Sequence, residues 1–176
     1  MSRLLNMTDR SDVPEQLLDS YDQVAELRGG AVSGPYGVLL HSPEAAIRGA
    51  ALSNYLRWNS APTAVQRETA ILTLAHHLDA QVMWAGHVRL GREVGVREGL
   101  FEAIEAGVDP VELPDEEAEI VRYVRELFET NRVSDATFEA LHERLGDQGI
   151  VDLTALLGYY AFVGATLNAF EITPRG

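Results

Sequence analysis

The sequence predicts an all-α protein that folds as a single-domain helical bundle, and three observations carry this prediction. Helix start signals recur along the chain, apolar residues between them repeat at helical spacing, and no stretch alternates apolar and polar residues long enough to form a strand. The 176 residues are most simply one domain, residues 1–176, and a hydrophobic share of 46% allows a sizeable core.

The N-terminal part predicts one helix followed by a loop. Asp12 with Glu15 three residues later matches a capping box, and the helix that it opens runs to about Leu27. Gly29-Gly30 ends this helix, because glycine readily takes the left-handed conformation found just after a helix end. Gly34-Pro35 then marks a loop.

The middle of the chain carries stronger start signals. Ser42-Pro43 places a capping residue before a proline at the first helical position, and this helix continues through Tyr55. Thr63 and Gln66 form the next capping box. Residues 107–114 are a loop between helices rather than a domain boundary. Three further helices are expected to begin at Asp79, at Pro114 with the acids Asp115, Glu116 and Glu117, and at Ser134.

The last apolar segment, residues 150–170, predicts a buried C-terminal helix. A membrane span is conceivable at this length, but Asp152 and Asn168 interrupt the segment and the rest of the chain is amphipathic. A helix that is apolar on nearly every side is either central in the fold or shared between subunits. Small residues along it allow close approach of a neighbour: Gly158, Ala161, Gly164 and Ala165.

The charge balance limits the partners of the protein. Its net charge is −13, from 27 acids against 14 cationic residues, so no basic stripe exists to bind nucleic acid. The cationic residues are all arginine, and the chain has no lysine. Either a salt-loving source or a GC-rich genome would explain this composition, and we favour the GC-rich genome.

The N-terminal residues are polar and include Asp9 and Asp12, which is unlike a signal peptide. We therefore expect a cytoplasmic protein that binds no membrane.

Two missing residue types restrict the chemistry. The chain has no cysteine, which excludes thiol nucleophiles, thiolate metal sites and disulfide redox cycles. All fourteen cationic side chains are arginine, which excludes Schiff-base chemistry and pyridoxal phosphate attachment through lysine. An enzyme with this composition works with carboxylates, imidazoles, guanidiniums and phenols.

Glu68 and His87 are the best candidates for such chemistry. Each lies on the apolar face of its predicted helix, in residues 63–78 and 80–95. A turn near Leu78-Asp79 places Glu68 eleven residues before it and His87 eight after it, so their axial offset is ~5 Å, about one helical turn. A carboxylate beside an imidazole forms a general acid–base pair. Alternatively, the acid pairs with an arginine and the histidine bonds a carbonyl group.

Five segments together resemble one known family. They are Leu39-Leu40-His41-Ser42-Pro43-Glu44; Arg67-Glu68-Thr69-Ala70-Ile71-Leu72; Trp84-Ala85-Gly86-His87-Val88 with Glu93-Val94-Gly95; Val133-Ser134-Asp135-Ala136-Thr137; and Leu157-Gly158-Tyr159-Tyr160. With these motifs the chain resembles the carboxymuconolactone decarboxylase family, which includes the alkylhydroperoxidase D-like proteins. The resemblance implies that fold, with a central helical hairpin, a family core over residues 36–171 and an N-terminal helical extension over residues 1–30.

The sequence departs from the hydroperoxidase branch at its reactive atoms. That branch carries a glutamate, a CxxC pair and a histidine as a proton relay, and its glutamate and histidine fall on Glu68 and His87. Its two cysteines fall on Ala80 and Met83, so thiol peroxidase activity is excluded. Trp84 precedes His87 here, as a tryptophan does in many cysteine-free members, and in this feature the chain resembles the decarboxylase-type group.

Five further residues are candidates for substrate binding. Arg67 and Arg89 flank the acid and the histidine, and either could hold a substrate carboxylate or form a surface ion pair instead. Trp84 lies one helical turn from His87 and would form a pocket wall, and Tyr160 brings a phenol to an apolar segment. His77 is a possible pocket neighbour, but its adjacent His76 points elsewhere, so no metal site is expected.

These residues predict a cofactor-free lyase or isomerase of the decarboxylase type. It would act by Glu–His general acid–base catalysis on a small carboxylated lactone or a related unsaturated metabolite from aromatic catabolism. The alternative is a non-catalytic helical oligomer that binds a small ligand or partner on a fold without its redox cysteines. The sequence offers no set of ligands for haem or a metal, so we do not expect an atypical haem or metal peroxidase. The resemblance also implies a homo-oligomer, such as a trimer or hexamer.

Overall fold

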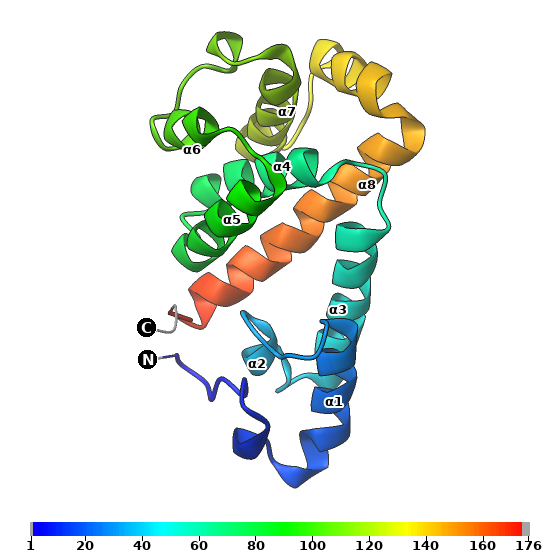
Figure 1. Cartoon of the computed structure of the whole chain (residues 1–176), viewed down its shortest axis with the longest axis vertical. Coiled ribbons are helices and arrows are strands. Elements are labelled where there is room, and N and C mark those ends of the chain that lie inside the picture. The colour runs from blue at the N-terminus through cyan, green and yellow to red at the C-terminus, as the bar shows by residue number, and fades with distance from the viewer. Residues whose placement is uncertain (1, 174–176) are drawn as a thin grey trace.

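The computed structural model describes residues 2–173, and the described residues are helical, with no strand among them. In Figure 1 a long C-terminal helix runs diagonally through the molecule, with the other helices arranged around it. In chain order the helices are α1 (Leu18–Leu27), α2 (Tyr36–Leu39), α3 (Pro43–Trp58), α4 (Ala64–His77), α5 (Gln81–Val94), α6 (Glu98–Glu105), α7 (Asp115–Thr130) and α8 (Asp135–Ala169), with 3₁₀ turns η1 (Arg10–Asp12), η2 (Glu15–Leu17) and η3 (Pro110–Glu112).

The predicted all-α bundle with a central hairpin is confirmed. Helices α4 and α5 form the hairpin, and α4 also packs against α7 and α8. One hydrophobic cluster joins the buried faces of α4, α7 and α8, a second joins α1, α2 and α3, and a third lies under α6. The second cluster gathers at the lower end of the molecule in Figure 1, apart from the hairpin.

Helix α8 is the predicted buried C-terminal helix, but only one of its faces is buried. Gly146 has φ 68° and ψ 179°, which breaks the helix and produces the bend that Figure 1 shows. By length and composition α8 could cross a membrane, yet 61% of its apolar window is buried inside the protein, as in a core helix of a soluble protein. Its outer face remains open, since Val151 is 65% exposed and Phe162 is 39% exposed.

The turn between α4 and α5 is held by backbone and side-chain contacts. Asp79 adopts the left-handed conformation with φ 48°, and the amide of Ala80 bonds the carbonyl oxygen of Ala75 at 2.9 Å. Asn168 of α8 donates its side-chain amide to the carbonyl oxygen of Leu78 at 2.9 Å. This bond satisfies a carbonyl at the end of α4 and fastens the hairpin turn to the core helix.

The predicted caps at Thr63 and Ser134 are confirmed, whereas Ser42 makes no capping bond and the helix expected to begin at Asp79 begins at Gln81, with Ala80 as its N-cap. Thr63 and Gln66 form both bonds of the capping box before α4, and Ser134 accepts a bond from the amide of Thr137 at the start of α8. Helix α3 begins at Pro43 as predicted, although the Ser42 side chain makes no capping bond, and the helix extends past Tyr55 to Trp58.

The helix predicted from Asp12 begins later than expected. Two 3₁₀ turns occupy residues 10–17, and α1 begins at Leu18. Pro14 separates the two turns, and a proline disfavours helical backbone at the residue before it. Asp9 rather than Asp12 supplies the cap, because it accepts a bond from the amide of Ser11.

The sequence prediction missed two helices. The loop expected at Gly34-Pro35 leads directly into α2, whose four residues are all buried, so tertiary packing stabilises this short helix. Helix α6 has no side-chain cap at Arg97, which removes the usual start signal. Its inner face is held by burial of Leu100, Phe101 and Ile104 in the third cluster.

The N-terminal segment packs across α2 and reaches the end of α8. The amide of Met7 bonds the carbonyl oxygen of Gly37 at 3.1 Å, and the amide of Arg3 bonds that of Phe170 at 2.9 Å. The two ends of the described part of the chain, residues 2–173, therefore lie together (Figure 1). This packing leaves no room at Gly37, where a Cβ atom would overlap the Asn6 side chain and lie 3.0 Å from the backbone carbon of Met7.

We expect Gly37→Ala to lower the free energy of unfolding by about 1–3 kcal/mol, because the added methyl group overpacks this contact. Gly86→Ala, inside α5, is the matched control, since a Cβ atom there meets nothing within 4 Å. The control should raise the unfolding free energy by about 0.5–1 kcal/mol through helix propensity alone. Urea denaturation measures both, and equal effects of the two substitutions would contradict the packing described here.

Candidate active site

A buried acid–base pair lies between the two helices of the hairpin. The Nδ1 atom of His87, on α5, is 2.6 Å from Oε2 of Glu68, on α4, and each side chain is 9% exposed. The two side chains meet as the hairpin geometry predicts. Because an ionised carboxylate only accepts, Nδ1 carries the hydrogen and donates it, which leaves Nε2 as the basic nitrogen of the ring.

His87 lines a small cavity of about 190 Å³ enclosed by the α1–α2 loop, α3, α5 and α8. Glu68 is not among the lining residues, so the acid stands behind the imidazole as its hydrogen-bond partner. The apolar part of the wall comes from α5 and α8. The polar lining side chains are Arg28, Ser33, Tyr36, Arg57, His87, Arg89, Tyr159 and Tyr160.

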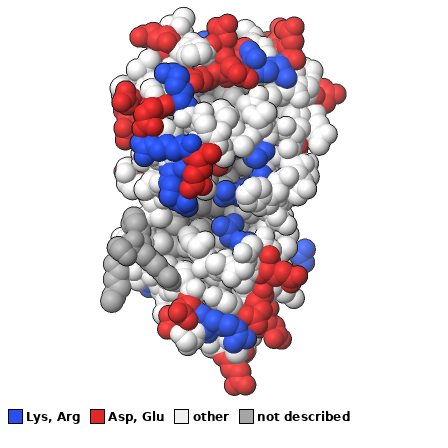
Figure 2. Space-filling view, viewed as in Figure 1, with Lys and Arg blue, Asp and Glu red and all other residues white. Residues whose placement is uncertain are grey.

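A wider cavity of about 540 Å³ adjoins the first and shares five of its lining residues, including Arg28, Arg57 and Arg89. The inner chamber holds His87, whereas the outer one is lined by the exposed Trp58. Figure 2 shows basic atoms around the hollow at the waist of the molecule, with one group of acidic atoms beside them and further acidic atoms towards the two ends. Three arginines against one acid, Glu26, line the wider cavity, so an otherwise acidic protein carries a locally positive charge at this opening, which favours anionic ligands.

Two aromatic side chains of α8 stand beside the imidazole. The Tyr160 ring meets His87 edge-on, with centroids 5.0 Å apart and planes at 87°, and it meets the Tyr159 ring at 5.1 Å. Burial raises the pKa of the Tyr160 hydroxyl above its ordinary value. The phenol is thus neutral at physiological pH and contributes an apolar edge to the chamber.

Arg28 is a site residue that the sequence prediction missed. Its guanidinium lies over the Tyr36 ring at 4.5 Å and donates from Nη1 to Oγ of Ser53 at 3.1 Å. Its Nε atom is buried and has no hydrogen-bond partner among residues 2–173. A buried guanidinium donor without an acceptor, at the wall of a cavity, is suited to an anionic ligand.

Arg57 was also missed, because the sequence gives no local signal for either arginine. Arg28 caps the end of α1 beside two glycines, and Arg57 lies in the last turn of α3 next to Trp58. Both positions resemble ordinary basic residues at helix C-termini. Only the packing of α1 and α3 near α5 and α8 brings these two guanidiniums to the cavity.

Of the five predicted substrate-binding residues, two line the cavity beside His87 and three do not. Tyr160 and Arg89 line the cavity, although Arg89 is mostly exposed and forms an ion pair with Glu93 at 2.7 Å. Arg67 is absent from the lining and donates instead to the carbonyl oxygen of Pro62, and burial lowers the pKa of its guanidinium. Trp84 is also absent, since it packs against His76 with ring centroids 6.1 Å apart.

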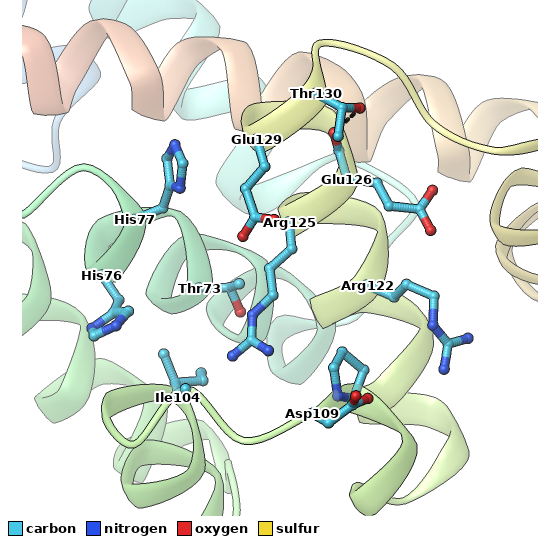
Figure 3. Close-up of a pocket in the computed structure, with 12 residues that line it drawn as sticks. Thr73, His76, His77, Ile104, Asp109, Arg122, Arg125, Glu126, Glu129 and Thr130 are labelled. Carbon is cyan, nitrogen blue, oxygen red and sulfur yellow. Dashed lines mark hydrogen bonds between the residues drawn. The ribbon is translucent and has the colours of Figure 1, made fainter.

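His77 lines a different cavity, of about 760 Å³, between α4, α7 and the loop before η3 (Figure 3). In this view His76 and His77 stand on one side and Arg125 faces them from α7. Two of its charged groups are already engaged, since Arg125 donates to the carbonyl oxygen of Val108 at 2.6 Å and Glu126 accepts from Ser134 and Thr137. No cluster of three or more metal-ligating side chains occurs among the described residues.

Comparison with solved structures identifies the fold. A peroxidase-related protein from Ralstonia eutropha JMP134 with an alkylhydroperoxidase AhpD core superposes with a TM-score of 0.76 at 17% identity, covering 99% of this chain and 92% of that one. The apo form of the debrominase Bmp8 superposes with a TM-score of 0.72 at 13% identity, covering 99% and 93%. No family model and no curated protein matches the sequence. The chain therefore has the alkylhydroperoxidase D-like fold.

We expect Glu68→Gln to release the fixed tautomer of His87. In the wild-type protein ¹⁵N spectra of the neutral ring should show a hydrogen on Nδ1 and none on Nε2, whereas a glutamine amide can donate or accept and enforces neither state. The free energy of unfolding should fall by roughly 1–3 kcal/mol with the lost charged hydrogen bond. His142, which pairs with Asp147 on the surface, is the internal control and should keep its signals. An unchanged His87 spectrum would contradict the pairing.

Proposed function

We propose that the protein is a cofactor-free lyase or isomerase of the carboxymuconolactone decarboxylase type in the cytoplasm. It acts on a small carboxylated lactone or a related unsaturated metabolite. One observation carries the proposal: a buried Glu–His pair exposes only its imidazole to a small chamber, and arginines surround the entrance. The alkylhydroperoxidase D-like fold is consistent with this proposal, and the absence of cysteine argues against a thiol-dependent reaction.

The pair would supply the proton that decarboxylation requires. When carbon dioxide leaves, the electrons of the broken carbon–carbon bond move into the conjugated carbonyl group and form an enolate, which must then be protonated at carbon. His87, protonated on Nε2 as an imidazolium that Glu68 stabilises, delivers this proton and is recharged from solvent. In an isomerisation the same nitrogen would remove a proton from one carbon and return it to another.

Arginines at the entrance would hold the substrate carboxylate. Arg28, Arg57 and Arg89 line both the inner and the outer cavity, and a guanidinium binds carboxylate with two parallel hydrogen bonds. Arg67, the other arginine expected from the sequence, faces the backbone of Pro62 instead. An inner chamber of about 190 Å³ suits a single small ring rather than a long chain.

Non-catalytic ligand binding on the same fold is the second candidate. Met83 and Ala80 occupy the positions that the resemblance assigns to the redox cysteines, and both are buried. A protein that had lost its chemistry there could keep the cavity as a binding site. Substrate turnover in matched variants separates this function from catalysis.

We expect turnover of a carboxylated lactone by the wild-type protein, and we expect His87→Gln to lower kcat/KM by about 10²–10⁴-fold, the usual contribution of a general acid–base group. Glu68→Gln should give a loss in the same direction. His142→Gln is the matched control, because His142 lies on the surface away from the cavity and should leave kcat/KM unchanged. Equal kcat/KM in His87→Gln and the wild type would contradict the proposed mechanism, and no turnover across a panel of such lactones would favour ligand binding.

We also propose that the protein forms a homo-oligomer, through the outer faces of α3 and α8. These two helices pack side by side, and Tyr55 of α3 bonds Asp152 of α8 at 2.9 Å. Apolar side chains project from both helices on the outside, which is the usual composition of an interface between identical subunits. The exposed apolar residues on them include Leu52, Tyr55, Val151 and Phe162.

We expect Leu52→Glu to reduce the oligomer mass measured by light scattering after size-exclusion chromatography, because a charge at the centre of an apolar contact is costly to bury. Val111→Glu is the control, since Val111 is 75% exposed on η3, outside these faces. A monomeric wild-type protein, or an oligomer unchanged by Leu52→Glu, would contradict an interface at this surface.

A further inference from the structure

The hydroxyl group of Tyr160 makes no hydrogen bond to residues 2–173, although Tyr160 is only 3% exposed. The other tyrosine hydroxyls of the chain all have partners: Tyr21 donates to the carbonyl oxygen of Thr8, Tyr36 and Tyr159 bond each other, Tyr55 bonds Asp152, and Tyr123 bonds Thr154. A buried tyrosine normally finds a partner for its hydroxyl, because burial removes the hydrogen bonds that water would make. The Tyr160 hydroxyl is therefore an exception that the packing of the protein does not explain.

This hydroxyl is accessible from the chamber beside His87. Within the described part of the chain, the side-chain atoms that are both completely enclosed and unpaired are Oδ1 of Asn6 and Nε of Arg28. The Tyr160 oxygen is unpaired but is not one of these atoms, so it is not completely enclosed. The chamber is the open space that Tyr160 lines. A ligand in the chamber can therefore supply the partner that the hydroxyl lacks.

The phenol is also a direct neighbour of the catalytic imidazole proposed above. The rings of Tyr160 and His87 meet edge-on with centroids 5.0 Å apart, and both side chains line the chamber. Glu68 occupies Nδ1 of His87, so the imidazole offers Nε2 to a ligand. One small ring can then contact both groups, with an oxygen atom at the phenol and a carbon atom at the imidazole.

Tyr160 can serve such a ligand as a hydrogen-bond donor and not as a base. Burial raises the pKa of its hydroxyl, so the phenol keeps its hydrogen at physiological pH. Because this hydrogen has no acceptor among residues 2–173, no bond within the described protein must break when a ligand oxygen accepts it. The donor is thus already in place before the ligand arrives, which lowers the cost of binding an oxygen there.

We propose that the Tyr160 hydroxyl donates a hydrogen bond to the carbonyl oxygen of the ligand, and that the chamber therefore selects compounds whose carbonyl group is conjugated with the reacting carbon. The inference rests on the proposed function for the reaction itself. As carbon dioxide leaves, the electron pair of the broken carbon–carbon bond moves to the carbonyl oxygen, and the hydrogen bond from Tyr160 strengthens with the negative charge there. The phenol keeps its hydrogen throughout, and the proton that the carbon receives comes from His87.

Kinetics of Tyr160→Phe test this role in the reaction. We expect kcat on a carboxylated lactone to fall about 10²–10³-fold, the usual effect of removing one donor to a developing oxyanion. KM should change little, because the bond is much stronger to the enolate than to the neutral carbonyl group. Tyr123→Phe is the matched control, since Tyr123 is buried but does not line the chamber, and it should leave kcat unchanged. A lactone turned over equally fast by Tyr160→Phe and the wild type would overturn the inference.

Binding of an enolate mimic tests the same hydrogen bond without turnover. 4-Nitrophenolate presents an anionic oxygen on a small ring, and 4-nitrotoluene replaces that oxygen with a methyl group. Calorimetric titration of the full-length protein, at a pH where the phenol is ionised, gives the dissociation constant of each probe. We expect Tyr160→Phe to weaken phenolate binding roughly ten- to a hundredfold, the effect of one hydrogen bond to a charged acceptor. Binding of 4-nitrotoluene, and of both probes to Tyr123→Phe, should match the wild type.

Equal phenolate affinity in Tyr160→Phe and the wild type, equal weakening of both probes, or failure of the wild type to bind the phenolate would each contradict the proposed donor. These results are independent of the acid–base mechanism. If no lactone is turned over but phenolate binding depends on Tyr160, the proposed function is wrong, whereas the hydroxyl is still the donor to a ligand oxygen.

Thermal unfolding separates this role from a structural one. Tyr160→Phe removes a hydroxyl without a partner in residues 2–173, so it should not lower Tm. Tyr123→Phe breaks the 2.8 Å bond to Thr154 and should lower Tm, because it removes a hydrogen bond that stabilises the fold. An equal fall of Tm in both variants would show that the Tyr160 hydroxyl bonds the protein itself, and the inference would then be wrong.

Discussion

The hydrogen bond between Glu68 and His87 is buried, and a buried carboxylate is tolerated only when a partner satisfies it. This requirement fixes the register of α4 against α5, since a slip of one residue on either helix would turn one partner away from the other. The turn at Asp79 and the bond from Asn168 to Leu78 hold that register from outside. Helix α8 therefore serves two purposes: it fastens the hairpin and brings Tyr159 and Tyr160 to the chamber.

The cavity depends on a contact between two parts of the core. The hairpin and α8 supply the imidazole, Arg89 and most of the apolar wall, whereas Arg28 at the end of α1, Arg57 of α3 and Tyr36 of α2 complete the polar wall. The N-terminal segment packs against α2 at Gly37, next to Tyr36, and so helps to fix the position of Tyr36. The first thirty residues, predicted as an N-terminal helical extension, thus include Arg28, a residue of the cavity wall.

The charge distribution and the site chemistry are consistent with each other. A protein with net charge −13 repels anions over most of its surface, but three arginines at one opening create a local attraction for them. Inside, the phenols stay neutral because burial raises the pKa of Tyr36 and of Tyr160. The chamber therefore offers hydrogen-bond donors without additional negative charge, next to an imidazole whose Nε2 atom makes no hydrogen bond to residues 2–173.

Local periodicity and composition determined much of this protein from the sequence: the all-α class, the capping box at Thr63, the exclusion of thiol and lysine chemistry, and the facing positions of Glu68 and His87. These features depend on residues within two adjacent helices, where spacing fixes direction. Helix α2, the placement of Arg67 and His77 away from the chamber, and the hydrogen bond between Tyr36 and Tyr159 were decided by tertiary structure alone. The physical reason is distance along the chain, because Tyr36 and Tyr159 are 123 residues apart and only the packing of α3 on α8 makes them neighbours.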